Sequence, residues 1–568
     1  MKKMRKPLCL LLATATVGAA FAGCDDLSGG YGDKTVIYVM NTGGGVGRVW
    51  LDEAIERFSE LKKDTSYEDG MTGVAFEVEH TLDTGVETMS TAGYNIYFDG
   101  GTGSVLRLQQ AGNLICIDDI VKEKIDTRDG QSVSIEDKIL ASDRDAFKGG
   151  DGKYYGLPHF ALHPGLTYNV DLFETEDMFI AAPGQDETKA ETEDSDYGTV
   201  EFALKGADGV YGTADDGKKS CGNDGVYGTY DDGLPTSLVE FMVLCDRMSN
   251  AGIEPISFRP GYEHYLIEAL WASLAGAEST QTRYSYTGTL EHVTGFDEDT
   301  PLFEGIDYIV KPITETTTIS RETGYLANDN VARYYAAAMT EILETEGWFS
   351  DYRLKGTLTH IDYMINFVFS GKNGKTKQGM FVEGDYWYNE ARDNDVLSDY
   401  ETLTKDTNRK MAWMPLPTAV YESVTEGNGR EYTMINTSAN AAFINANISN
   451  QPGLVQACKD FLQFCYTDEE LAHFTGTTGV YKASMEYPVA DVVENMPYFS
   501  KSVSVCKSAS TTATVNAQKD ELYNNNIMYP TLDKKYGSYW KAMREGYTAQ
   551  EIFEASRTKA AGWGVTNL

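Results

Sequence analysis

Residues 34–110 alternate between two hydrophobic patterns, and this alternation limits the fold more than any other feature of the chain. Runs rich in β-branched and aromatic residues predict strands at 34–40, 74–78 and 95–98. Between them, Leu51, Ala54, Ile55, Phe58 and Leu61 recur at helical spacing, and 105–110 is a second helix candidate. The order strand, helix, strand, strand, helix predicts an α/β protein with an open sheet.

Ligands of open α/β sheets bind beyond the carboxyl ends of the strands. Here those ends are the segments 41–45 and 99–102. The triple glycine at 43–45 belongs to neither of the patterns GxGxxG and GxxxxGK[ST], so a phosphate loop is rejected. The candidate ligand-binding residues from these segments are Asn41, Thr42, Gly101 and Thr102.

The N-terminal residues predict export. Lys2, Lys3, Arg5 and Lys6 precede an apolar run at 8–20 that is too short to span a bilayer, as in a signal peptide at 1–23. The following Phe21-Ala-Gly-Cys24 resembles the lipobox of bacterial lipoproteins, although Phe21 departs from the usual aliphatic residue. Acylated Cys24 and a polar, Gly-rich tether at 24–34 would hold the protein on the outer face of the cytoplasmic membrane. The alternative is an ordinary cleaved signal with an incidental cysteine.

The charge and the cysteines exclude several classes of protein. A net charge of −38 would repel nucleic acid and anionic lipid, so neither is expected as a partner. The chain has 36 Tyr and 7 Trp, whose amphipathic rings suit neutral sugars as well as cores. Six cysteines follow Cys24 without a CxxC pair or metal-like spacing, and buried thiols are favoured over a disulfide.

Several segments, in order, resemble one family. They are 152–158 (GKYYGLP) with 165–173, 234–241 with 251–255, 379–387 (GMFVEGDYW), 414–417 (MPLP), 441–479, and 539–540 with 549–553. Together they are similar to the extracellular solute-binding proteins of family 1, the sugar-capturing subunits of ABC importers. The chain departs from that pattern by insertions at 174–235 and about 280–330.

The resemblance implies a fold and a function. The fold would be the α/β, two-lobed periplasmic-binding-protein-like fold (type II) with discontinuous lobes. One lobe would comprise 35–158 and 440–495, and the other 159–437 and 496–568. The protein would be a monomer that closes on a carbohydrate, such as an oligosaccharide, and delivers it to an ABC transporter permease, with no enzymatic activity and no required cofactor.

The candidate sugar-binding residues combine carboxylates for hydroxyl groups with aromatic rings for sugar faces. Glu383, Asp385, Tyr386 and Trp387 supply both kinds within five residues, and Trp387 is the expected stacking ring. The other candidates are His159, Arg259, Tyr262 and Trp413. Core packing is the alternative for every aromatic residue in this set.

Two other functions stay open. A tethered glycoside hydrolase could use Glu383 and Asp385, which share a strand face at positions i and i+2, as its two carboxylates. A binding protein for a non-sugar solute, such as a polyamine, peptide or metal, would also tolerate the negative charge. No other catalytic motif supports the hydrolase.

The insertion at 174–235 contains a repeated acidic loop. Residues 206–217 recur as 222–233 with ten of twelve positions identical. Clustered carboxylates on Gly-bent backbone suit a structural Ca²⁺ ion, and the units resemble the Gly-Asp calcium repeats of secreted bacterial proteins. The alternative is a pair of solvated Asp-Gly turns. The candidate ligands are Asp208, Asp215, Asp216, Asp224, Asp231 and Asp232.

Overall fold

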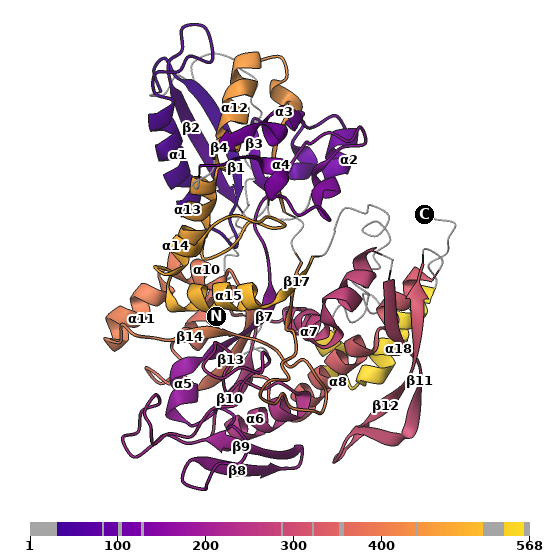
Figure 1. Ribbon diagram of the computed structural model, residues 1–568. Helices are drawn as coiled ribbons and strands as arrows, with labels where there is room; N and C mark the ends of the chain where they lie inside the picture. The colour runs from indigo at the N-terminus through magenta and orange to yellow at the C-terminus, as the bar shows by residue number, and fades with distance from the viewer. Residues whose placement is uncertain are drawn as a thin grey trace, which may run out of the picture.

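The computed structural model describes residues 31–81, 85–99, 105–126, 130–285, 288–320, 323–351, 357–437, 440–514 and 539–561. They form two bodies, one above the other in Figure 1, which we call the first and second lobes. In the described part of the chain, no helix combines the length and the apolar character needed to cross a membrane.

The first lobe is built around a five-stranded sheet in the order β2-β1-β3-β16-β6. Strand β1 (Thr35–Thr42) pairs in parallel with β2 (Val74–Thr81) and β3 (Ile96–Asp99). Strand β16 (Ala441–Ile444) runs antiparallel to both β3 and β6 (Leu157–Pro158), although it is more than 280 residues later in the chain. A late segment of the chain therefore completes the N-terminal sheet.

Amphipathic helices close the core of the first lobe. Helix α1 (Val49–Leu61) buries Trp50, Leu51 and Phe58, and α12 (Pro452–Phe464) buries Phe461 against Phe58. The remaining elements are α2 (Val105–Gln110), α3 (Asp118–Lys122), β4 (Lys124–Asp126), β5 (Ser132–Ser134), α4 (Ile135–Lys138), α13 (Asp468–Thr478), α14 (Ala490–Val493), and the 3-10 turns Val86–Thr88, Arg144–Phe147 and Ala446–Ile448.

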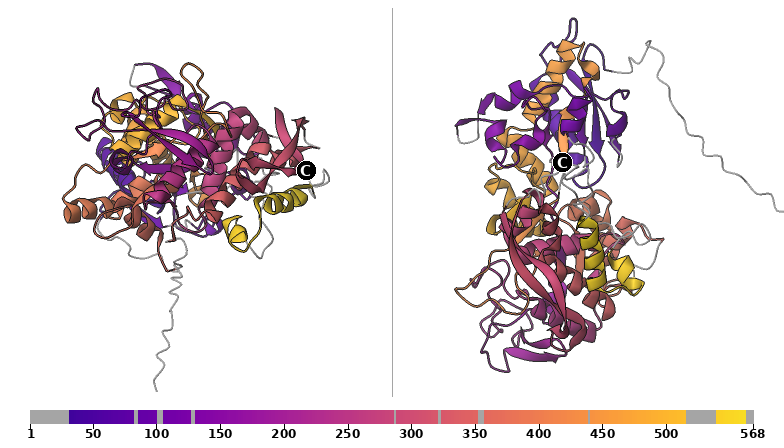
Figure 2. Two further views of the ribbon diagram at one scale, coloured as in Figure 1. Left: turned by 90° about the horizontal axis from the view of Figure 1, so that it is seen from below. Right: turned by 90° about the vertical axis from the view of Figure 1, so that its right-hand side faces the viewer.

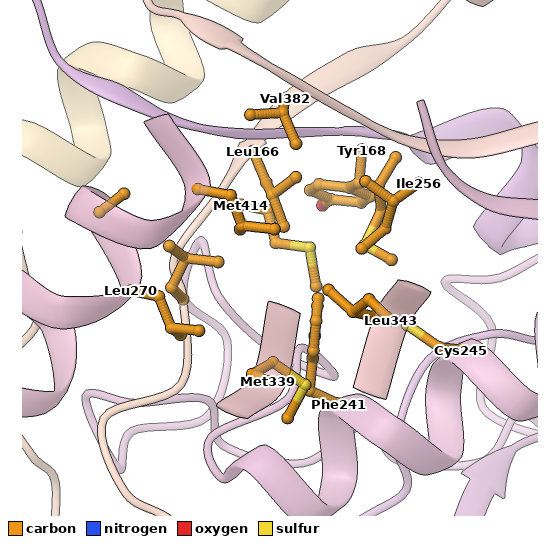
Figure 3. Close-up of a cluster of buried hydrophobic side chains, with 14 of the residues drawn as sticks. Leu166, Tyr168, Phe241, Cys245, Ile256, Leu270, Met339, Leu343, Val382 and Met414 are labelled. Carbon is orange, nitrogen blue, oxygen red and sulfur yellow. The ribbon is translucent and has the colours of Figure 1, made fainter. Parts of the chain in front are cut away.

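The second lobe has a four-stranded sheet in the order β10-β13-β7-β14. Strand β13 (Gln378–Gly384) is parallel to β10 (Glu254–Ser257) and antiparallel to β7 (Pro164–Asn169), which pairs with β14 (Met411–Met414). Helices α6 (Leu238–Asn250), α7 (Glu263–Ser285) and α8 (Val331–Thr345) pack beside it. Figure 3 shows the resulting core, in which sheet residues such as Leu166 and Val382 lie over Phe241 and Met339 of the helices.

The other elements of the second lobe surround this core. They are α5 (Val170–Thr175), β8 (Ala190–Ser195), β9 (Gly198–Ala203), β11 (Gly288–Phe303), β12 (Ile306–Ile319), the 3-10 turn Gly324–Asp329, α9 (His360–Val368), α10 (Trp387–Asp393), α11 (Val396–Thr404), β15 (Thr433–Asn436), α15 (Tyr498–Ala509), β17 (Thr511–Thr514), α17 (Tyr539–Arg544) and α18 (Ala549–Ala561). The two insertions supply the β8–β9 hairpin and the long β11–β12 hairpin at the edge of the lobe (Figures 1 and 2).

The connections between the lobes are bonded to one another. The Ala161 N–H donates to the Tyr481 carbonyl at 2.7 Å, and the Thr437 N–H donates to the Leu162 carbonyl at 2.9 Å. Three segments that are far apart in the sequence therefore lie side by side where the chain passes between the two sheets.

The six cysteines beyond residue 30 are all unpaired thiols, as expected, and five of them are buried.

Candidate functional site

The lobes touch through the loop that follows β1. The N–H of Gly45, in the first lobe, donates to Oε1 of Glu390 on α10 at 2.6 Å. The side-chain amide of Asn389 donates back to the Gly45 carbonyl at 2.9 Å. Gly45 has φ +71°, and a Cβ there would meet the Phe160 ring at 3.1 Å. Glycine is therefore needed both for the turn and for this close approach.

A group of tyrosines and acids adjoins this contact. Strands β10 and β13 are parallel, so their carboxyl ends share one sheet edge, and Arg259 and Glu383 lie at those ends. Tyr386 follows β13, and its hydroxyl lies 3.3 Å from that of Tyr265 at the start of α7. We call this group the interlobe cluster; it comprises Arg259, Tyr262, Tyr265, Glu383, Tyr386 and Glu390.

Arg259 is exposed, and its Nη1 donates to the Tyr262 hydroxyl at 3.4 Å while the guanidinium lies 5.3 Å from that ring. Burial raises the pKa of Glu383 and of Glu390, and the charge of Arg259 opposes that rise from a distance. The cluster therefore combines aromatic faces, hydroxyl groups, two carboxyl groups and one cation.

The two carboxyl groups are unusually basic. Burial raises the pKa of Glu383 well above its ordinary value, and the nearby Glu390 raises it further. Burial also raises the pKa of Glu390 to about 7, against the opposing effect of the Gly45 N–H. Near neutral pH, the protonation of these two carboxyl groups, and with it the charge of the cluster, therefore depends on the charges and hydrogen-bond donors around them.

The two tryptophans do not lie where we expected them. Trp387 is fully buried, its indole N–H donates to the Thr167 hydroxyl at 2.9 Å, and its ring packs against the core rings Phe367, Phe381 and Phe499. Trp413 is buried on β14 against Gly165. Both indoles fill the core of the second lobe, and neither offers a free face to a sugar.

Asp385 and His159 are also engaged inside the protein. Asp385 binds His163 with both oxygens, at 3.1 Å to the backbone N–H and 2.7 Å to Nδ1. His159 is fully buried beside Trp50 and lies 3.3 Å from Nζ of Lys482. These side chains brace the region where the chain passes between the lobes and are not positioned to contact a ligand.

Asn41 and Thr42 are the last residues of β1, whereas we expected them to lie beyond it. The Asn41 amide donates to the Gly47 carbonyl at 3.0 Å and lies 2.9 Å from Nδ1 of His80. It therefore supports the loop that carries Gly45. The candidates Gly101 and Thr102, and the lipidation candidate Cys24, lie outside the described residues.

Of the sugar-binding candidates, the structure brings together Arg259, Tyr262, Glu383 and Tyr386. Sequence reasoning missed Tyr265, Glu390 and the direct role of Gly45. The signal for Glu390 was its position seven residues after Glu383, on the helix that begins at Trp387, the last residue of the segment 379–387.

The two acidic repeats lie in different environments. In the first, the candidate ligand atoms of Asp208, Asp215 and Asp216 lie within 4.8 Å of one another at an exposed loop. Backbone N–H groups of Gly206, Gly212 and Thr213 already donate to Asp216 at 2.6–2.7 Å. The clustered charge is thus partly neutralised by the loop itself.

The second repeat packs against the loop 416–430, where the Arg430 N–H donates to the Asn223 carbonyl. Asp231 is buried, and burial raises its pKa. Among the described residues, the triad of the first repeat is the only acidic group whose ligand atoms lie close enough together to hold one metal ion. Asp224, Asp231 and Asp232 of the second repeat do not form such a group.

Comparison with solved structures identifies the architecture. No protein-family model and no curated sequence matches the chain. A chitin oligosaccharide binding protein superposes with a TM-score of 0.53 at 14% identity, covering 93% of this chain and 99% of that one. The chain has the solute-binding-protein fold.

Two other structures are similar at the same coverage of this chain. The bacterial solute receptor AcbH, described as having an exclusive preference for β-D-galactopyranose, superposes with a TM-score of 0.51 at 11% identity and is covered over 98% of its length. The solute-binding protein RafE, solved in complex with raffinose, also gives 0.51 at 11% identity and is covered over 99%. The α/β solute-binding fold that the sequence predicted is confirmed.

Proposed function

We propose that this protein is a membrane-tethered, extracytoplasmic receptor that captures a carbohydrate between its lobes and delivers it to an ABC transporter permease. The observation that carries the proposal is the interlobe cluster, which places three tyrosines and two carboxyl groups where the lobes touch. The protein shares its fold with a chitin oligosaccharide binding protein and with RafE, which was solved in complex with raffinose. This similarity supports the same function.

The chemistry of the cluster suits a sugar. Carboxyl groups accept hydrogen bonds from hydroxyl groups, and tyrosine rings cover the C–H faces of a pyranose. Glu390 and Tyr386 belong to the second lobe in sequence but contact Gly45 of the first. A ligand at this point would therefore bind both lobes and favour their closed arrangement.

The hydrolase alternative is weaker. Hydrolysis needs two carboxyl groups on either side of the scissile bond. Asp385 is 3% exposed and is held by His163, so it is not free to act as the second one. Sugar capture without turnover is therefore the better account of Glu383 and its neighbours.

The test is a thermal-shift screen of oligosaccharides, followed by calorimetry. A ligand at a hundred times its Kd should stabilise the protein by about 2.7 kcal/mol. Tyr262→Ala should weaken binding about tenfold, which is about 1.4 kcal/mol. Tyr498→Ala removes an exposed ring outside the cluster and should leave the affinity unchanged.

Stabilisation by polyamines or peptides alone would refute sugar capture. Release of shorter sugars during the incubation would instead support the hydrolase.

A further inference from the structure

Helix α10 is fixed to the second lobe by one face and contacts the first lobe with another. Trp387 and Ala391, four positions apart, are fully buried in the core of the second lobe. Tyr386, Asn389 and Asp393 follow the spacing i, i+3 and i+7, so they lie together on a different face. The helix is therefore a fixed part of the second lobe that presents polar groups away from its core.

The first lobe meets this polar face with the loop that follows β1. Gly45 exchanges hydrogen bonds with two adjacent residues of α10. Gly47 has φ +65°, and a Cβ there would collide with the Asp393 carboxylate. The Asn41 amide holds the same loop from inside the first lobe by donating to the Gly47 carbonyl at 3.0 Å. The helix therefore packs directly on the loop backbone, and each side of this contact is fixed within its own lobe.

Arg392 makes a second contact with the first lobe. Its Nη1 donates at 2.7 Å to the carbonyl of Thr477, in the last turn of α13, which lies above α10 in Figure 1. The carbonyl groups of a last helical turn carry the negative end of the helix dipole, so a guanidinium stabilises them. Arg392 also donates to Oδ1 of Asn389, which leaves the amide nitrogen of Asn389 to donate to Gly45. One arginine therefore connects the two contacts.

We propose that α10 is a latch between the lobes, in which Asn389 and Arg392 are positioning residues that favour the joined arrangement without contacting a ligand. Neither residue belongs to the interlobe cluster, although both flank Glu390, which does. A ligand that binds both lobes needs them joined, so the latch reduces the free energy that this ligand must supply. The effect on affinity rests on the proposed function, whereas the effect on the lobe arrangement does not.

The lobe arrangement can be tested without any ligand, by small-angle X-ray scattering. Arg392→Met keeps a long side chain but removes the donors, so its radius of gyration should exceed that of the native protein. Arg430→Met is the matched control, because Arg430 donates to the carbonyl of Glu422 within the second lobe. This control should scatter as the native protein does, with its lobes joined.

Ligand affinity gives a second measurement, with chitotetraose and raffinose as the probes in calorimetry. Arg392→Met should raise the Kd of each probe that binds by about tenfold, because it loses a hydrogen bond of a charged group. The factor should be the same for every probe, since the lost interaction lies between the lobes and not at the ligand. Arg430→Met should leave each Kd unchanged.

The outcomes separate the latch from the proposed function. If Arg392→Met scatters as Arg430→Met does, α10 does not hold the lobes and the inference is overturned, even if affinity falls. Native protein whose free lobes are already apart would overturn it as well. If scattering changes as expected but no oligosaccharide binds the native protein, the latch stands and sugar capture fails. Should circular dichroism show that Arg392→Met is unfolded, Asn389→Ala decides by the same two measurements.

Discussion

Trp387 shows how far a residue's type alone can mislead. Its neighbours Glu383 and Tyr386 belong to the interlobe cluster, but α10 begins at Trp387 and turns its ring away from them. A large ring one residue from a site is still governed by the face of the element on which it lies.

Trp387→Ala should destabilise the protein by about 3–5 kcal/mol, because the substitution leaves a cavity among Phe367, Phe381 and Phe499. Chemical denaturation measures the effect. The ligand affinity of the molecules that remain folded should change little, in contrast to that of Tyr262→Ala. If the variant keeps its stability but loses its affinity for the ligand, Trp387 is part of the binding site after all.

At the scale of elements, the acidic repeats show two nearly identical sequences in different environments. The first loop is exposed and gathers three carboxyl groups, whereas the second is packed against residues 416–430. The difference follows from what the rest of the second lobe places beside each copy. A shared motif therefore does not imply a shared role.

If the first repeat binds Ca²⁺, adding the ion should protect residues 206–217 from proteolysis and raise the melting temperature modestly, while a chelator reverses both changes. Residues 222–233 should be protected with or without the ion, because packing already holds them. Asp208→Asn is the matched variant, since it removes one charge at an exposed position. Identical digestion with Ca²⁺ and with chelator would show that the loop is a solvated turn.

Helix α18 begins against a buried acid. Oε2 of Glu341, on α8, accepts the N–H of Ala549, and burial raises the pKa of Glu341 to about 7. Because this carboxyl group is protonated more readily in the folded protein, its stabilising effect is complete below about pH 4.5. It is lost as the pH rises through about 7.

Glu341→Gln should therefore raise the stability above pH 7 by up to about 3 kcal/mol and leave it unchanged near pH 4. Melting curves across this range measure the difference. Glu554→Gln, at an exposed position of α18, should show no such pH dependence. An equal shift at both pH values would assign the effect to packing instead of ionisation.

At the scale of the whole molecule, the two lobes interlock through segments distant in sequence. Glu390 and Gly45 are 345 positions apart, and β16 enters a sheet that begins at residue 35. The lobe closure that we propose would therefore deform the bonded segments near 161, 437 and 481 rather than a single linker.

The tethering proposed for the whole molecule depends on Cys24. Cys24→Ser should release the protein from membranes or leave its signal uncleaved, because the serine hydroxyl is not the acylated thiol of a lipobox. Fractionation with mass spectrometry of the N-terminus measures both. Processed protein that carries serine at this position and still sediments with the membrane would refute lipid anchoring. Sugar affinity of the released protein should match that of the native form.

The sequence by itself determined the local elements and their order. Hydrophobic spacing is a property of neighbouring residues, so it predicted α1 and the strands β1–β3, and the ordered motifs predicted the solute-binding fold. It also identified the segment that carries Glu383 and Tyr386.

Only the tertiary structure decided which of those side chains meet. Periodicity records the face of an element but not what lies opposite it, so it could not distinguish Trp387 in the core from Tyr386 at the lobe contact. Nor could it pair Gly45 with Glu390, because their contact depends on how two separately packed cores come together. The charge environment of Glu383 follows from that arrangement, since burial and the distance to other charges are set in three dimensions.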